Sequence, residues 1–160
     1  MTRKQFIELI AAEQESLRRF LRGLCGGDGF RADDIAQEAL LKAYLSYERF
    51  EGRSRFSTWL FRIAYNCYID NHRKARPEMV GTDAPAALNV RASEETDAAF
   101  RYQQLYQALD RLSEKEKAAI VLHYFEDRSI KEIASILQIP QGTVKYHLST
   151  GRNHLKSLLQ

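Results

Sequence analysis

The chain has 160 residues, of which 44% are hydrophobic, and this predicts a globular protein of one domain or two small ones. It contains no run of about 18 apolar residues, and the early Glu8 breaks a signal-peptide pattern, so we expect no membrane insertion and a cytoplasmic location. Cys25 and Cys67 lie far apart with no histidine at ligand spacing, which predicts buried reduced thiols, no metal site and no cofactor.

The N-terminal part predicts two helices joined by a glycine-rich connection. Apolar residues recur at helical spacing from about Lys4 to Leu24, and the run Gly26-Gly27-Asp28-Gly29 ends this helix. We expect the second helix to be capped by Asp33 or Asp34 and to run from Ile35 to Tyr47. One of its stripes (Ile35, Ala39, Ala43 and Tyr47) is apolar and is expected to face inward.

The other stripe of the second helix mixes polar residues with two large apolar ones, Leu41 and Tyr44. Polar members of such a stripe can simply form a solvated face. Exposed apolar side chains between them favour a surface that binds another protein.

The stretch from Gly52 to Arg76 carries six basic residues and one acid, a larger charge excess than the +3 of the whole chain. We therefore expect an anionic partner. Aromatic residues alternate with these cations, which is typical of a site where phosphates meet cations and unstacked bases meet aromatic rings. Aromatic residues at helical spacing also build cores, so Trp59 and Phe61 are alternatively core residues.

Residues 77–98 change in character, with five acids and one base, two prolines and a glycine. This composition predicts a flexible acidic linker. An acidic tether of this kind is either merely solvated or able to pass through a basic channel or shield a DNA-binding face.

The last third of the chain predicts a helix-turn-helix unit. A helix is expected from about Thr96 to Arg111, and two capping boxes, starting at Ser113 and Ser129, open further helices. A turn through Pro140 leads into a last helix that reaches about Leu158. Residues 139–160 contain three basic residues and no acid, as expected of a helix in the major groove. A helical bundle that does not bind DNA is the alternative.

Three segments resemble sigma factors, the promoter-specificity subunits of bacterial RNA polymerase. Thr58-Trp59-Leu60-Phe61-Arg62-Ile63-Ala64-Tyr65-Asn66 resembles the signature of the extracytoplasmic-function group, on the helix that engages the promoter element nearest the start site. Asp34-Ile35-x-Gln37-Glu38-x-x-Leu41-x-x-Tyr44 resembles the helix that docks on the largest polymerase subunit. Ser129 to Lys145 looks like the reader of the upstream promoter element, a module that response regulators share.

The resemblance implies an all-α protein with two small helical domains. These are an N-terminal helical bundle (1–76), which binds polymerase and the near-start element, and a C-terminal helix-turn-helix domain (99–160), joined by the linker 77–98. It also implies a sigma factor without enzymatic activity. Its partners would be core RNA polymerase and promoter DNA, both duplex and melted non-template strand, and an anti-sigma factor is left open as a further partner.

The same resemblance implies three sets of contact residues. The polymerase-binding set is Asp34, Gln37, Glu38, Leu41 and Tyr44. The set for the near-start element is Phe50, Arg53, Ser54, Arg55, Phe56, Trp59, Arg62, Asn66, Asn71, Arg73 and Lys74. The set for the upstream element is Lys131, Thr143, Lys145, Tyr146, His147, Arg152 and Lys156.

Several details are left open. Asn66 is expected to read a non-template base, although a mid-helix asparagine can instead bond a neighbouring loop. Tyr146-His147 replaces the Ser-Arg of the family and Gly151 stands where alanine is common, so the bases read by the last helix are undetermined.

Two other classes of function compete with that of a sigma factor. A stand-alone helix-turn-helix regulator with a ligand- or partner-sensing N-terminal domain is the alternative to a sigma factor. A nucleic-acid enzyme is disfavoured because the four histidines show no metal or acid–base spacing. We expect His72 and His147 to lie near phosphates or bases instead.

Overall fold

The computed structural model describes the backbone of residues 1–79 and 97–160 and the side chains of residues 1–73 and 99–160. Within these residues the chain is helical and forms no strand, which confirms the predicted all-α class. The elements in chain order are α1 (Arg3–Leu24), α2 (Gly29–Ser46), the short 3-10 turn η1 (Tyr47–Arg49), α3 (Phe56–Met79), α4 (Asp97–Asp110), α5 (Glu114–Ile120), the π-helical turn η3 (Val121–Phe125), α6 (Ile130–Leu137) and α7 (Gln141–Leu159).

The connection between α1 and α2 is tighter than the sequence suggested. Gly26 and Gly27 both adopt positive φ (66° and 88°), a conformation that glycine adopts without steric cost, and they reverse the chain within two residues. Asp28 then caps α2, because its carboxylate accepts a hydrogen bond from the amide three residues on, at 3.1 Å. The predicted cap at Asp33 or Asp34 is therefore wrong, and both residues lie inside α2.

The elements of the helix-turn-helix unit are confirmed. In each capping box the hydroxyl of the serine accepts from the amide three residues on, and the glutamate there accepts from the serine amide. These pairs are Ser113 with Glu116 and Ser129 with Glu132. Gln138, in the left-handed region with φ 58°, ends α6, and α7 begins three residues later.

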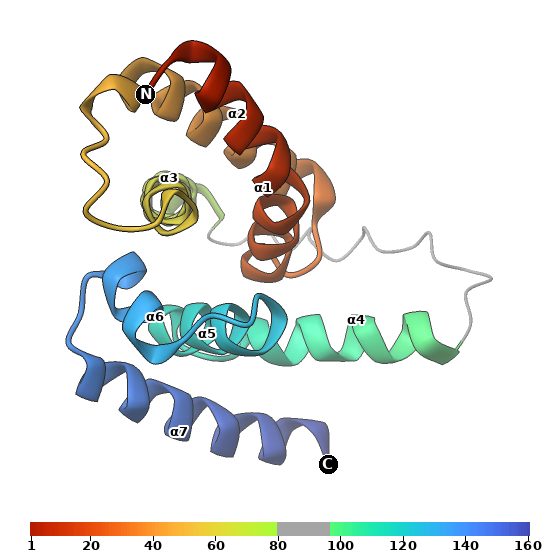
Figure 1. The fold of residues 1–160 in the computed structure, drawn as a ribbon. Coiled ribbons are helices and arrows are strands. Elements are labelled where there is room, and N and C mark those ends of the chain that lie inside the picture. The colour runs from red at the N-terminus through yellow and green to blue at the C-terminus, as the bar shows by residue number, and fades with distance from the viewer. Residues whose placement is uncertain (80–96) are drawn as a thin grey trace.

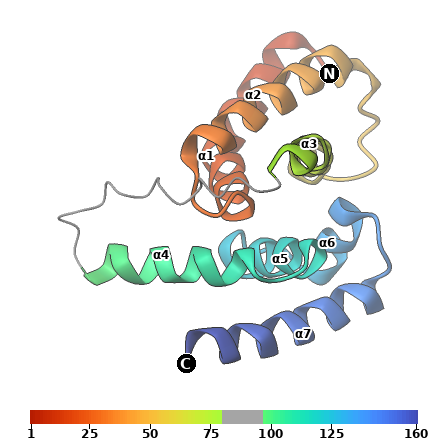
Figure 2. The same cartoon turned by 180° about the vertical axis from the view of Figure 1, so that it is seen from behind.

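Two halves stack on each other, the first formed by α1 to α3 and the second by α4 to α7 (Figure 1). The view from behind shows the same two layers, with α3 facing α6 (Figure 2). One continuous apolar core runs through both, since it includes Phe61 and Tyr68 of α3 as well as Leu122 and Ile133 of the second half.

The boundaries of the predicted linker differ from those of the helices. α3 continues to Met79 and α4 begins at Asp97, so the two helices extend into the range 77–98. The rest of that range, residues 80–96, lies outside the described residues. Among the described helices, none combines the length and apolar character that a bilayer span requires.

Candidate nucleic-acid and protein interfaces

One face of α2 is open to solvent, and we call its members Asp34, Gln37, Glu38, Leu41 and Tyr44 the α2 face. All five are exposed, whereas Ile35, Ala39 and Ala43 of the opposite stripe are buried and Tyr47 is half-buried. Leu41 is 58% exposed, and Leu45, four residues further on, is 72% exposed. Apolar side chains surrounded by hydrogen-bonding groups form the kind of surface on which a partner helix docks. The sequence interpretation missed Leu45, although its spacing from Leu41 was a usable signal.

An aromatic cluster lies where the η1–α3 loop meets α3. The Phe50 and Trp59 ring centroids are 5.2 Å apart, and those of Phe56 and Trp59 are 5.5 Å apart. Phe56 is buried and Trp59 is half-buried. A direct nucleic-acid contact by Phe56 is therefore disfavoured in this arrangement, and its ring instead supports Trp59. Phe61 is a core residue, as the alternative interpretation of these aromatics predicts. It is buried, and its ring stacks on that of Phe20 with the ring centroids 5.0 Å apart.

The other members expected at the near-start element differ in accessibility. Arg53, Asn66 and Arg73 are exposed, and Ser54 is half-buried. Arg53 pairs with the neighbouring Glu51 at 2.9 Å, in a contact that solvent largely screens. Lys74 lies on α3, but its side chain is outside the described residues.

Two cations of this set are engaged by α6. Arg55 Nη1 lies 2.8 Å from the Glu132 carboxylate. Arg62 donates from Nε to the Ser135 carbonyl at 3.0 Å and from Nη2 to the Ser135 hydroxyl at 2.6 Å. These partners are more than 70 residues away along the chain, so no local pattern could have indicated them.

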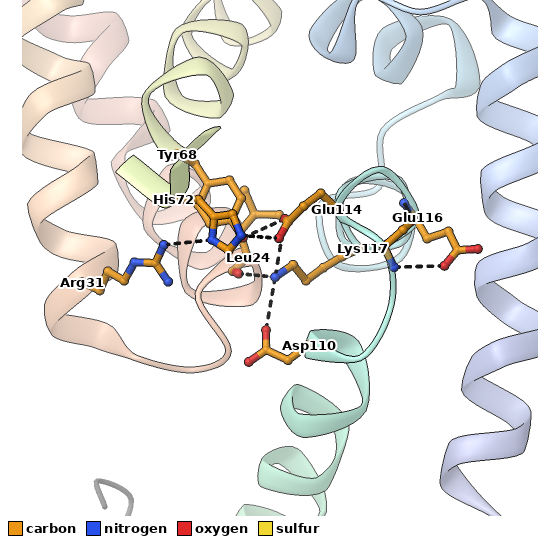
Figure 3. A network of polar contacts seen from close by, with 9 residues as sticks. Leu24, Arg31, Tyr68, His72, Asp110, Glu114, Glu116 and Lys117 are labelled. Atoms are coloured by element: carbon orange, nitrogen blue, oxygen red, sulfur yellow. Dashed lines mark hydrogen bonds and ion pairs between the residues drawn. The ribbon is translucent and has the colours of Figure 1, made fainter. Parts of the chain in front are cut away.

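Asn71 also has a partner within the first half, because its side-chain oxygen accepts from Arg31 Nε at 3.1 Å. His72, expected near phosphates or bases, instead lies with Nε2 3.1 Å from the Glu114 carboxylate (Figure 3). In this arrangement both side chains serve contacts within the chain, and their access to DNA stays a prediction.

Tyr68 completes the contact with Glu114. Its ring is fully buried, and its hydroxyl donates to the same carboxylate at 2.8 Å (Figure 3). Burial and the negative charge of Glu114 raise the pKa of the Tyr68 hydroxyl far above its ordinary value. Tyr68 is therefore a permanent hydrogen-bond donor across the contact between the halves.

The helix-turn-helix unit presents a basic outer surface. Its exposed members are Lys131, Lys145, Tyr146, Arg152 and Lys156, while Thr143 and His147 are half-buried. The opposite side of α7 packs into the core through Val144 and Leu148. Arg152 donates to the hydroxyl of Tyr124 at 3.1 Å, which adds an exposed aromatic residue that the sequence interpretation missed.

Comparison with known proteins gives matches to both halves. The family model for Sigma-70 region 2 matches residues 9–78, and the model for Sigma-70, region 4 matches residues 102–155. The chain is 36% identical to the ECF RNA polymerase sigma factor SigW of Bacillus subtilis over 146 residues, which cover 84% of this chain and 78% of SigW. It is 31% identical to EcfG of Rhodopseudomonas palustris, over 94% of this chain and 82% of EcfG.

Solved structures resemble the chain over nearly its whole length. The sigma factor RpoE of Bartonella quintana, solved in complex with the anti-sigma factor NepR, has a TM-score of 0.78 and 27% identity, with 98% of this chain and 97% of that chain covered. CnrH, solved in complex with the cytosolic domain of CnrY, has a TM-score of 0.75 over 99% of this chain and 89% of that chain. Its identity of 22% supports the fold alone.

Proposed function

The chain belongs to the extracytoplasmic-function group of sigma-70 family RNA polymerase sigma factors, and we propose that its α2 face docks on the core enzyme while α3 and α7 engage promoter DNA. As a sigma factor it binds core RNA polymerase and directs promoter-specific transcription initiation. We assign residues 1–76 and 99–160 to the two DNA-engaging domains and residues 77–98 to the linker. We also place the protein in the cytoplasm, with no catalytic activity of its own.

The observation that carries the docking proposal is the exposed α2 face. Leu41 and its neighbour Leu45 expose apolar surface that a partner would remove from water, at about 25 cal/mol for each Å² buried. Gln37 and Glu38 flank this surface with groups that donate and accept hydrogen bonds. Such an arrangement gives both affinity and a defined orientation.

Gel filtration with core RNA polymerase tests this proposal. The native chain should co-elute with the core enzyme, and Gln37→Ala/Glu38→Ala should not. The matched control is Gln14→Ala/Glu15→Ala, another adjacent Gln–Glu pair, which lies on α1 and should leave co-elution intact. Equal binding by the native chain and the α2 variant would contradict the docking site.

For α3, we propose that it captures melted non-template DNA. Opening the duplex costs a few kcal/mol per unstacked base, and a preformed site recovers part of this cost through stacking and base-edge hydrogen bonds. Asn66 is exposed and its amide both donates and accepts, while half-buried Trp59 offers an aromatic edge nearby on the same helix. Arg53, Arg62 and Arg73 would supply cations for the phosphates.

The comparison of Asn66→Ala with Asn71→Ala tests the role of α3. A lost base contact of about 1–3 kcal/mol corresponds to a drop of roughly 5- to 150-fold in open-complex formation for Asn66→Ala. Asn71→Ala serves as an internal control: the resemblance also assigns Asn71 to this element, but its amide oxygen is engaged by Arg31, so we expect a smaller loss there. An Asn66→Ala effect no larger than that of the control would exclude Asn66 as a base reader.

At the upstream element, we propose that the N-terminal half of α7 lies in the major groove. Lys145 and Tyr146 are exposed there, and the exposed Lys131 and Arg152 would contact phosphates. Core polymerase would fix the distance between the two promoter elements, since it holds both halves at once.

An anti-sigma factor is a further proposed partner. The sigma factor RpoE, similar in structure over 98% of this chain, was solved with such an inhibitor. The α2 face would suit an inhibitor as well as polymerase, since its exposed apolar residues are available to either. An inhibitor acting there must remove core polymerase from the chain when added, and an undisturbed polymerase complex would contradict this proposal.

A further inference from the structure

Phe30, the second residue of α2, projects into solvent. It is 90% exposed, more than any other large hydrophobic residue that the structure describes. An isolated exposed apolar residue is common on protein surfaces, whereas one that continues an apolar patch marks a binding surface. Phe30 precedes Asp34 by four residues and Leu41 by eleven, so it lies on the same side of α2 as both of them. The exposed surface that contains the α2 face therefore begins one helical turn before Asp34.

We propose that Phe30 is an anchor residue for core RNA polymerase, and that its ring enters an apolar pocket of the core enzyme next to the α2 face. This inference rests on the proposed docking of the α2 face on the core enzyme. It adds a contact that the family signature of this helix, which begins at Asp34, does not contain. An aromatic ring that fills a pocket at an interface contributes a large share of the binding free energy.

Two side chains close to Phe30 in the chain hold this turn of α2 against the other helices of the first half. Arg31 donates from Nε to the side-chain oxygen of Asn71 on α3 at 3.1 Å. Asp33 accepts from Arg18 of α1 at 2.6 Å. These contacts fix the backbone that carries Phe30 before any partner arrives. Less conformational freedom is then lost on binding, which favours an anchor at this position.

The pattern of side chains along α2 indicates the chemistry of the partner surface. Phe30 lies at one end, and Leu41 and Leu45 lie at the other, with about 22 Å of helix between Phe30 and Leu45. Asp34 and Glu38 are exposed between these apolar ends. The complementary surface has apolar pockets at both ends and basic groups between them. A surface of this length belongs to a folded protein rather than to a small ligand.

A second copy of the chain fits this surface poorly. In a symmetric antiparallel pair of α2 helices, the register that places each Phe30 against the Leu45 of the other copy has its twofold axis between residues 37 and 38. The two Glu38 carboxylates would then lie next to each other and repel. The core enzyme has no such constraint, and it is the partner with which a sigma factor works.

Equilibrium binding to core RNA polymerase tests the anchor in the full chain. The chain carries fluorescein at its C-terminus, and its anisotropy is measured as core enzyme is added. Phe30→Ala should weaken binding at least about tenfold, which corresponds to about 1.4 kcal/mol, whereas Phe30→Leu keeps much of the apolar surface and should lose less. The matched control Phe100→Ala makes the same change at a phenylalanine of α4 that is 59% exposed, and it should bind like the native chain.

The titration has two results that would overturn the inference. One is native-like affinity of Phe30→Ala. The other is an equal loss in Phe100→Ala, because the effect would then follow from removing any exposed ring rather than from the position of Phe30.

Photocrosslinking tests the contact while retaining an aromatic side chain. The photoreactive residue p-benzoylphenylalanine replaces Phe30, and the chain is irradiated in complex with core RNA polymerase. The expected product is a covalent adduct with a core subunit, identified by mass spectrometry. An adduct between two copies of the chain, or no adduct at all, would overturn the inference.

Transcription separates a role in polymerase binding from a role in DNA recognition. With core enzyme and genomic DNA, Phe30→Ala should use the same start sites as the native chain and reach the same maximal output. Half-maximal output should require at least about tenfold more of the variant. New start sites, or a lower maximum at saturating chain, would assign Phe30 to a later step and overturn the anchor.

The Gln37→Ala/Glu38→Ala variant distinguishes failure of this inference from failure of the proposed docking. If that variant loses core binding while Phe30→Ala keeps it, the docking of the α2 face stands and the anchor alone is refuted. If both variants bind like the native chain, the docking is refuted and the anchor with it.

Discussion

Lys117→Met is expected to weaken the fold by removing one buried contact between the halves. Lys117 is almost fully buried and its ammonium group donates to the Leu24 carbonyl at 2.8 Å. Methionine retains the length and packing of the side chain, so the main loss is a charge-assisted hydrogen bond and the pairing of a buried carbonyl. Asp110 is half exposed and regains hydration at little cost. We therefore expect a loss of about 2 kcal/mol in the free energy of unfolding.

Urea denaturation followed by circular dichroism measures this loss. With a denaturant slope of about 2 kcal/mol per M, the midpoint should fall by roughly 1 M. Lys115→Met is the matched control, because it makes the same substitution at another lysine of α5. Lys115 lies 5.1 Å over the Tyr65 ring, and burial lowers the pKa of its ammonium group. The control should change stability by less than about 1 kcal/mol, because methionine keeps a contact with the Tyr65 ring. Equal midpoints for the two variants would refute the assigned role of Lys117.

Two further predictions concern packing and thiol reactivity. Gly151→Val should destabilise the chain by about 2 kcal/mol in urea denaturation, because even a single Cβ added at Gly151 would lie 3.0 Å from an Ile120 side-chain carbon. Gly142→Ala is the control and should not destabilise, because a Cβ added there meets nothing within 4 Å. A loss of stability in Gly142→Ala, together with none in Gly151→Val, would contradict the close packing at Gly151. Burial raises the pKa of the Cys25 thiol to about 11, so roughly one molecule in a thousand is a thiolate at pH 8. Iodoacetamide should therefore label Cys25 much more slowly in the native chain than in urea, and equal rates would contradict its burial.

Local sequence signals predicted the helix-turn-helix unit well. The capping boxes at Ser113 and Ser129 specify where helices begin through contacts that span only three residues, and both form as expected. The start of α2 was missed for a local reason as well. Two consecutive glycines complete the turn in fewer residues than a flexible connection would, so the cap falls at Asp28.

The partners of the basic helix could not be predicted from local patterns. Arg55 and Arg62 have the charge and spacing of nucleic-acid contacts, but whether they are free depends on where α6 packs. Gly151 illustrates the same limit. In sequence it is a residue of poor helix propensity, whereas the structure shows that α7 approaches Ile120 so closely there that an added Cβ would lie 3.0 Å from an Ile120 side-chain carbon.

Mapping of transcription start sites tests the sigma-factor function most directly. Core RNA polymerase is incubated with genomic DNA of the source organism, with and without the purified chain, and the 5′ ends of the transcripts are sequenced. The chain should create discrete new start sites that share upstream elements, and Gln37→Ala/Glu38→Ala should abolish them. No new start sites, together with tight binding of the free chain to duplex DNA, would contradict the sigma-factor function and favour a stand-alone regulator.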